Sequence, residues 1–227
     1  MNRHELGCTV VAFKAGLLAV LSAPWALDAP WLNFLCKPLA TAALIALAWP
    51  RGRDWPWQRA CVLAGLALSW CGDVALLWPQ QGFLPGLVSF LLAHLAYLLA
   101  FTRASATPQG PVGARLAAVL WPFLAFAAVA GTVLHHLWPG VPAALRGPVV
   151  VYVLALASMA AQAAVLWRLG QPRAGVLALG GALFVASDAL LATNKFAGPL
   201  PFSSFWILAT YWPAQWCIAR WLPPPAR

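Results

Sequence analysis

Eight long apolar stretches, separated by short segments rich in Pro, Gly and charged residues, run through the whole chain. Each is close to the roughly 20 residues that an α-helix needs to cross the hydrocarbon core of a bilayer. The pattern leaves no room for a separate globular domain. It predicts an all-α polytopic membrane protein with eight transmembrane helices, at approximately residues 6–26, 31–49, 60–78, 84–102, 114–135, 147–168, 174–193 and 203–222.

The composition excludes a soluble fold. Of the 227 residues, 63% are hydrophobic and 8% are charged, whereas a soluble domain is about 45–50% apolar and about 25% charged. The net charge of +9 comes from residues scattered singly between apolar stretches, so we expect no nucleic-acid partner. The five cysteines are odd in number and form no CxxC pair, so we expect neither a disulfide framework nor a zinc site.

The chain is expected to form a single membrane domain. Lys14 divides the first apolar run, and no clear A-x-A cleavage site follows it. These features favour a retained first helix over a signal peptide. We therefore expect one domain over residues 1–222 and a short cytoplasmic tail over residues 223–227.

Basic residues are concentrated on one side of the predicted topology. The loops of the opposite side carry only Arg146 and Lys195. Because Lys and Arg hold loops in the cytoplasm, both termini are predicted to be cytoplasmic, and we expect the bacterial inner membrane. The ten basic residues on the predicted cytoplasmic side are Arg3, Arg51, Arg53, Arg59, Arg103, Arg115, Arg168, Arg173, Arg220 and Arg227.

A short motif occurs twice, four segments apart. Residues 72–77 and 187–192 each contain a small residue, an Asp, two further residues and then a Leu at the same spacing. An even offset preserves direction across the membrane, so a duplication would give two parallel four-helix repeats. Leu- and Ala-rich helices also resemble one another by chance, and the motif leaves both interpretations open.

Ionisable residues inside apolar segments are the first candidates for a functional site. Each costs about 2.5–3.5 kcal/mol to insert and usually faces a cavity or a partner. Lys14 lies near a segment end, where its side chain can reach the interface, whereas Lys37, Asp73 and Asp188 lie deeper. Counted from the nearest cytoplasmic arginine, the two Asp residues lie roughly 21–23 Å into the membrane. They are thus expected at one level, in the outer half.

Other polar side chains occur at comparable levels and are expected to line one pocket with them. Metal binding is not expected, because the histidine among them has no second ligand at metal-binding spacing. The alternative is that each Asp merely ties helices together by accepting hydrogen bonds. The polar candidates are His94, Tyr97, Asn194, Tyr211 and Gln215.

Three stretches resemble the signatures of a known family. One covers residues 70–101, with a GD-x-x-LL element at Asp73, and a second is Lys37-Pro38-Leu39. The third covers residues 181–219, with an SD-x-x-LA element at Asp188 and a Y-x-x-x-Q element that ends at Gln215. Together they are similar to the YhhN family of integral-membrane lysoplasmalogenases. The chain departs from the Tyr pair usual in that family, because Trp212 follows Tyr211.

The resemblance implies hydrolysis of the vinyl ether bond of lysoplasmalogen, a lysophospholipid, within the membrane lipids. The products would be a fatty aldehyde and glycerophosphoethanolamine or glycerophosphocholine. Asp73 and Asp188 would be the catalytic pair, one as general acid and the other as an anion that stabilises the cation and activates water. Lys37 would bind the substrate phosphate or tune this pair. Tyr211, Gln215 and the other polar candidates would bind substrate or orient water, and no cofactor is expected.

Two other classes of function stay open at this point. A proton-coupled small-molecule transporter also uses paired intramembrane Asp residues, and it predicts water access from both faces. A structural membrane protein predicts that Asp73→Asn and Asp188→Asn fold and function normally. The polar residues cluster toward one face, which favours the enzyme. The sequence does not indicate an oligomeric state.

Overall fold

The computed structural model describes residues 3–104 and 112–225, and most of them are helical. Within these residues no strand occurs, which confirms the predicted all-α fold. Residues 105–111, in the fourth predicted connection, and residues 226–227 of the predicted tail lie outside the described residues. The helices are α1 (Arg3–Leu21), α2 (Pro30–Ala48), α3 (Pro56–Ala75), α4 (Phe83–Arg103), α5 (Val112–Leu137), α6 (Ala143–Arg168), α7 (Ala174–Phe196) and α8 (Ser203–Trp221), with a 3₁₀ turn (Trp138–Gly140) after α5.

Each predicted segment coincides with one helix, and the differences are confined to the ends. Helices α2 and α3 begin at Pro30 and Pro56, because a proline in the first turn lacks only an N–H that would be unpaired there anyway. Three predicted positions were wrong. Asn194, expected after the seventh segment, and Lys195, assigned to a loop, lie inside α7, and Arg146, assigned to a loop, lies inside α6.

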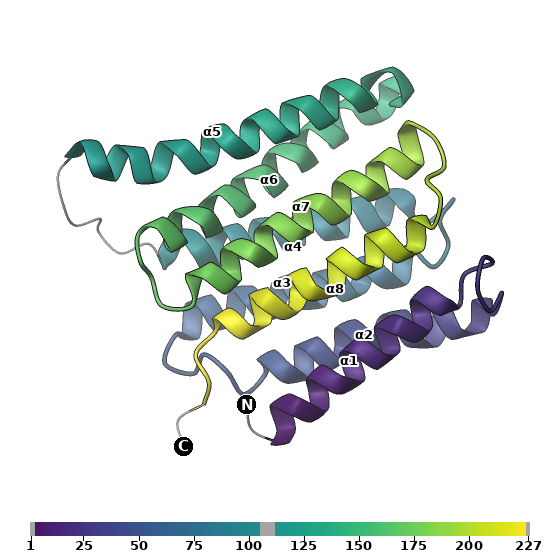
Figure 1. Ribbon diagram of the computed structural model, residues 1–227, viewed down its shortest axis with the longest axis horizontal. Helices are drawn as coiled ribbons and strands as arrows, with labels where there is room; N and C mark the ends of the chain where they lie inside the picture. The colour runs from purple at the N-terminus through teal and green to yellow at the C-terminus, as the bar shows by residue number, and fades with distance from the viewer. Residues whose placement is uncertain (1–2, 105–111, 226–227) are drawn as a thin grey trace.

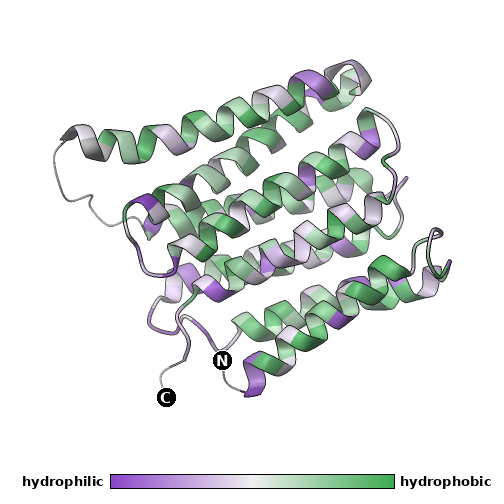
Figure 2. Ribbon diagram, in the orientation of Figure 1, coloured by the Kyte–Doolittle hydropathy of each residue, from purple (hydrophilic) through white to green (hydrophobic). Residues whose placement is uncertain are grey.

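The protein is an integral membrane protein. Six of its helices, all except α3 and α8, are long and apolar enough to cross a membrane by length and composition. Figure 2 shows hydrophobic residues along the helices and hydrophilic residues mainly at their ends and turns. Helices α3 and α8 are less apolar because they carry polar side chains in their inner turns, among them Asp73 and Gln215.

The helices lie side by side and alternate in direction (Figure 1). In that view α1, α8 and α7 form the nearer row, α2, α3 and α4 lie behind them, and α6 and α5 extend the bundle on one side. Helix α8 contacts α7, α1 and α2, and α3 contacts α4 and α2. Helix α8 thus lies in the interior of the bundle, whereas α3 keeps an exposed face and α5 packs mainly on α6.

A buried arginine joins distant parts of the chain at the end of the bundle that holds both termini, which we call the terminal end (Figure 1). Arg51, in the loop between α2 and α3, is 1% exposed. Its guanidinium forms an ion pair with Glu5 of α1. It also donates to the carbonyl oxygens of Arg220 (3.0 Å) and Leu222 (2.5 Å). The first helix, this loop and the last helix are therefore held together by one side chain.

Arg51→Ala should destabilise the fold, because it removes these bonds and leaves buried acceptors behind. Removing one partner of a buried ion pair typically costs about 3–5 kcal/mol. The matched control is Arg53→Ala in the same loop, where the side chain is exposed and the expected change is within about 0.5 kcal/mol. Thermal unfolding of both purified variants in the same detergent measures the difference. Equal stability of the two variants would contradict the role given to Arg51.

Candidate active site

The first buried carboxyl group, that of Asp73 on α3, is held by three side chains. The Thr41 hydroxyl donates to Asp73 Oδ2 at 2.6 Å, and the Tyr211 hydroxyl donates to the same oxygen at 2.8 Å. Lys37 Nζ lies 3.9 Å from the other oxygen, Oδ1. Asp73 is 2% exposed, so these partners from α2 and α8 replace the water that a carboxylate would otherwise bind.

Local sequence explains how α2 and α8 present these partners. Lys37 and Thr41 are four residues apart and thus share one face of α2. Tyr211 and Gln215 have the same spacing on α8, and Gln215 Nε2 lies 3.3 Å from the Tyr211 hydroxyl oxygen. The two side chains therefore share one face of α8.

A second layer of hydrogen bonds orients the first. The Tyr97 hydroxyl of α4 donates to Gln215 Oε1 at 2.6 Å. The Trp212 indole donates to Thr41 Oγ1 at 3.3 Å. Trp212, where the chain departs from the family's usual Tyr pair, thus supports the hydroxyl that donates to Asp73.

The second carboxyl group, that of Asp188 on α7, has a separate set of partners. The Tyr152 hydroxyl of α6 donates to Asp188 Oδ2 at 2.5 Å. His94 Nε2 of α4 lies 3.2 Å from the same oxygen and 3.0 Å from the Tyr152 hydroxyl oxygen. His94 is fully buried. These three residues form a compact cluster joining α4, α6 and α7.

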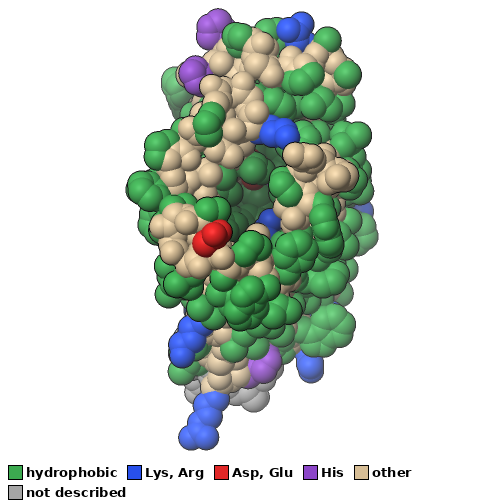
Figure 3. All heavy atoms as spheres, turned by 90° about the vertical axis from the view of Figure 1, so that its right-hand side faces the viewer, with side chains coloured by type: hydrophobic (Ala, Val, Ile, Leu, Met, Phe, Trp, Pro, Cys, Tyr) green, Lys and Arg blue, Asp and Glu red, His purple; other side chains and the backbone are tan. Residues whose placement is uncertain are grey.

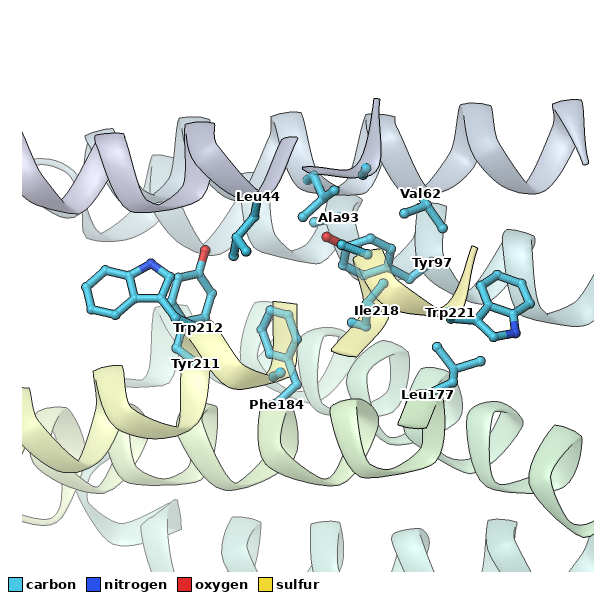
Figure 4. Packing of buried hydrophobic residues seen from close by; sticks show 14 of the residues in the cluster. Leu44, Val62, Ala93, Tyr97, Leu177, Phe184, Tyr211, Trp212, Ile218 and Trp221 are labelled. Carbon is cyan, nitrogen blue, oxygen red and sulfur yellow. The ribbon is translucent and has the colours of Figure 1, made fainter. Parts of the chain in front are cut away.

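A buried aromatic ring lies between the two carboxyl clusters. The Phe184 ring is 4.7 Å from the His94 ring and 5.6 Å from the Tyr211 ring, centroid to centroid. Figure 4 shows Phe184 beside Tyr211 in the buried core, with Tyr97 further along. Close packing of α3 on α4 also fixes the Tyr97 ring, because a Cβ on Gly65 of α3 would lie 2.3 Å from that ring. The two clusters are therefore neighbours within one packed interior.

A cavity with both apolar and polar lining residues opens at the end of the bundle opposite the terminal end. We call this cavity the mouth. Figure 3 looks onto this end and shows a central hollow with atoms of charged side chains visible inside it. The mouth has a volume of about 500 Å³. Its polar lining residues are Ser22, Asn33, Lys37, Asn194, Lys195, Ser203 and Ser204.

A second cavity, which we call the chamber, lies between α4, α5, α6 and α7. Asp188 and Tyr152 lie in its wall, and the other lining side chains are apolar. Leu76, Phe83 and Leu191 line both cavities. We call these three residues the collar. The collar thus separates the mouth from an apolar space that contains one carboxyl group.

The polar residues predicted from the sequence are divided among these features. Tyr97 belongs to the Asp73 cluster, whereas its neighbour His94, expected on the same face, contacts Asp188. Asn194 lines the mouth, but its Oδ1 accepts a hydrogen bond from the Leu200 backbone at 2.9 Å. Lys14 is exposed on α1.

Three residues of the site were missed from the sequence. Tyr152 had a signal, because the chain has only three tyrosines against 14 tryptophans, and tyrosine is the aromatic residue that brings a hydroxyl to an apolar helix. Thr41 had a weaker signal in the sequence, because it lies four residues from Lys37 and thus on the same helix face. Lys195 was assigned only to a loop, although it lies in the last turn of α7 and lines the mouth.

The fold and the site define an integral membrane protein with two carboxyl clusters in its interior. The model of the YhhN family matches residues 32–222. The chain belongs to the YhhN family.

Curated relatives agree with this assignment. The chain is 37% identical to lysoplasmalogenase TMEM86B of Sus scrofa over 190 residues, which cover 83% of this chain and 74% of the relative. It is 33% identical to TMEM86B of Homo sapiens over the same shares of the two chains. It is also 35% identical to a lysoplasmalogenase of Mycobacterium bovis, over 68% of this chain and 55% of that relative. No solved structure matches the chain.

Proposed function

We propose that this protein is a lysoplasmalogenase, which hydrolyses the vinyl ether bond of lysoplasmalogen to a fatty aldehyde and a glycerophosphoalcohol. The observation that carries the proposal is a pair of carboxyl groups inside the helix bundle, the buried Asp73 and the partly buried Asp188, each of which accepts a hydrogen bond from a tyrosine hydroxyl. Asp188 lies in the wall of the chamber, and Lys37, the partner of Asp73, lines the mouth. The names of the relatives support the same activity. They do not favour a transporter.

The surroundings of the two carboxyl groups suit different roles. Asp188 lies in the wall of the chamber, where it can reach a bound lipid and donate a proton. Asp73 accepts two hydroxyl hydrogen bonds and faces the Lys37 ammonium, which stabilises negative charge. We therefore assign Asp188 as the general acid and Asp73 as the anion. Lys37 is then the counter-ion of Asp73, and it also faces the mouth.

The reaction consumes one water and returns both carboxyl groups to their starting states. Asp188 protonates the β-carbon of the vinyl ether, and the double-bond electrons form the new C–H bond, leaving an oxocarbenium ion. Water adds to the α-carbon and loses a proton to Asp73, which gives a hemiacetal. Asp73 then protonates the ether oxygen as its bond to the α-carbon breaks. The hemiacetal hydroxyl returns its proton to Asp188, and the aldehyde leaves.

The decisive experiment compares lysoplasmenylethanolamine with its saturated alkyl ether analogue. The purified protein should release fatty aldehyde from the vinyl ether only, because the saturated ether has no carbon that can be protonated to an oxocarbenium ion. Aldehyde is measured by trapping it as a hydrazone. Equal cleavage of both lipids, or no cleavage of either, would refute the proposed reaction.

We also propose that all eight helices span the membrane, with both termini in the cytoplasm. Helix α8 would be accepted as a span because it packs inside the bundle. Helix α3 would be accepted because its exposed face carries apolar residues such as Trp57 and Trp70. The location of both described ends of the chain at the terminal end supports an even number of spans (Figure 1). The parallel four-helix repeat stays a prediction.

Reporter fusions test this topology. A fusion within residues 51–59 should report a cytoplasmic location, and one within residues 79–82 an external location, because the positive-inside rule places the arginine-rich loops in the cytoplasm. Activity of an alkaline phosphatase and of a green fluorescent reporter distinguishes the two sides. Inverted signals at either site would overturn the proposed orientation.

A further inference from the structure

The mouth is large enough to hold the polar part of a lipid. Its volume is about 500 Å³, which lies within the roughly 300–1,000 Å³ typical of ligand pockets. The chamber, at about 80 Å³, is too small for a head group. Figure 3 shows the mouth as an open hollow at this end of the bundle. Its wall includes residues of α2, α7 and α8 and of the loop between α1 and α2.

The rim of the mouth is held in place by contacts between segments that are far apart in the sequence. The Trp25 indole, in the loop between α1 and α2, donates to Ser204 Oγ of α8 at 3.0 Å. Its ring also packs edge-on against the Phe202 ring, with 5.2 Å between the centroids. On α7, Asn194 Oδ1 accepts a hydrogen bond from the Leu200 backbone at 2.9 Å. The mouth therefore has a fixed wall.

These rim contacts occupy acceptor atoms and leave donors for a ligand. The amide oxygen of Asn194 is bonded to the backbone, whereas its amide N–H groups have no partner among the described residues. The oxygen of Ser204 accepts the indole N–H, and its own O–H likewise has no acceptor within the described chain. Both side chains line the mouth together with Lys195, which carries donors alone. Such a set of donors suits an anion with several oxygens, such as a phosphate.

The mouth also has an excess of positive charge. In the described part of the chain no Asp or Glu lines it, whereas Lys37 and Lys195 do. Lys37 Nζ already lies 3.9 Å from a carboxyl oxygen of Asp73. Lys195 is exposed and forms no ion pair with a described carboxylate, and its Nζ lies 4.9 Å from the centre of the Phe83 ring. Lys195 is therefore the cation of the mouth that is available to an anionic ligand.

We propose that the mouth binds the phosphodiester head group of a lysophospholipid, and that Lys195 selects for this group by binding its phosphate. The inference rests on the proposed function for the identity of the lipid. A phosphodiester carries one negative charge and two unesterified oxygens, which match the ammonium of Lys195 and the free donors of Asn194 and Ser204. A lipid of the same chain without the phosphate leaves these donors unused and binds more weakly.

Lys195→Gln should weaken binding of 1-O-hexadecyl lysophosphoethanolamine at least about tenfold, because hydrogen bonds from a charged donor to phosphate are the strong ones. Binding of 1-O-hexadecylglycerol, which has the same chain and no phosphate, should stay within about twofold. Lys195→Arg keeps the charge and should retain affinity for the phospholipid within about threefold. Lys195 is exposed, so these variants are expected to fold.

Both probes are saturated ethers, so they bind without being cleaved. Binding is measured as the concentration dependence of thermal stabilisation of the full chain in a maltoside detergent, which contains no competing phosphate. The matched control is Arg146→Gln, near the start of α6 at the same end of the bundle. Arg146 is also an exposed cation over an aromatic ring, with its guanidinium carbon 5.0 Å from the centre of the Trp138 ring, but it does not line the mouth. Its substitution should leave the affinity for both lipids unchanged.

Inorganic phosphate distinguishes a lipid site from a site for the free anion. It should stabilise the wild type far less than the phospholipid does at the same concentration, because it lacks the glycerol and the chain. Equal stabilisation by inorganic phosphate would identify a site for free phosphate and overturn the proposal.

The remaining outcomes separate this proposal from the proposed reaction. Equal affinity of the wild type for the two ethers would overturn the head-group site. Unchanged affinity in Lys195→Gln, or a loss that is the same for both ethers, would also overturn it. Any of these results could coexist with aldehyde release from lysoplasmalogen. Conversely, a phosphate-dependent loss in a protein that releases no aldehyde would support the head-group site and refute the reaction.

Discussion

Asp73→Asn and Asp188→Asn should each lower the rate of aldehyde release by about 10²–10⁴-fold, the range typical of a lost general acid or base. The amide keeps the size of the carboxyl group and most of its hydrogen bonds, but it cannot deliver or accept a proton. Because the two groups act in one sequence of proton transfers, the double variant should be little slower than either single variant.

The matched control for these changes is Asp54→Asn. Asp54 is exposed in the loop between α2 and α3, so its substitution should leave kcat within about twofold. Initial rates are measured at saturating lysoplasmalogen, with thermal unfolding to verify that each variant is folded. A folded Asn variant at either site with near-normal turnover would refute the catalytic pair, as would strictly additive losses in the double variant.

The three tyrosines should differ in importance according to what their hydroxyls bind. Tyr152 and Tyr211 donate to carboxyl groups, whereas Tyr97 donates to an amide oxygen. Hydrogen bonds to charged groups contribute about 1.5–3 kcal/mol and neutral ones about 0.5–1.5 kcal/mol. Asp73 is the proposed anion, and Asp188 becomes charged when it donates its proton. Tyr152→Phe and Tyr211→Phe should therefore lower kcat roughly tenfold to hundredfold, and Tyr97→Phe by less than about tenfold.

Each Phe variant keeps the buried ring and loses only the hydroxyl, which makes the series internally matched. Steady-state kinetics on lysoplasmalogen give kcat and KM for the three variants. The expected losses lie mainly in kcat, since the hydroxyls orient catalytic groups and do not hold the lipid. A larger loss of kcat at Tyr97 than at both other positions would show that the hydrogen bonds to Asp73 and Asp188 do not determine the effect of each hydroxyl on turnover.

The helices and the two carboxyl groups could be predicted from the sequence because both depend on the free energy of placing one short stretch of chain in lipid, which the residues of that stretch determine. A run of about 20 apolar residues has few alternatives to a buried or spanning helix. A charged residue within such a run needs a partner.

The partners of each carboxyl group could not be predicted, because they come from other helices. The repeated motif around Asp73 and Asp188 is nearly the same, yet Asp73 faces Thr41 and Tyr211, whereas Asp188 faces Tyr152. Helix pairing depends on where small residues and aromatic rings lie along the whole face of each helix. His94 and Tyr97 illustrate the same limit. They are one turn apart on α4 but contact different clusters.

The contacts of Arg51 have a consequence for biosynthesis. Its two backbone acceptors belong to Arg220 and Leu222, so they are synthesised long after Arg51 itself. The terminal end therefore cannot close until α8 has been made. A truncation before residue 220 would remove both acceptors and leave the guanidinium of Arg51 without them.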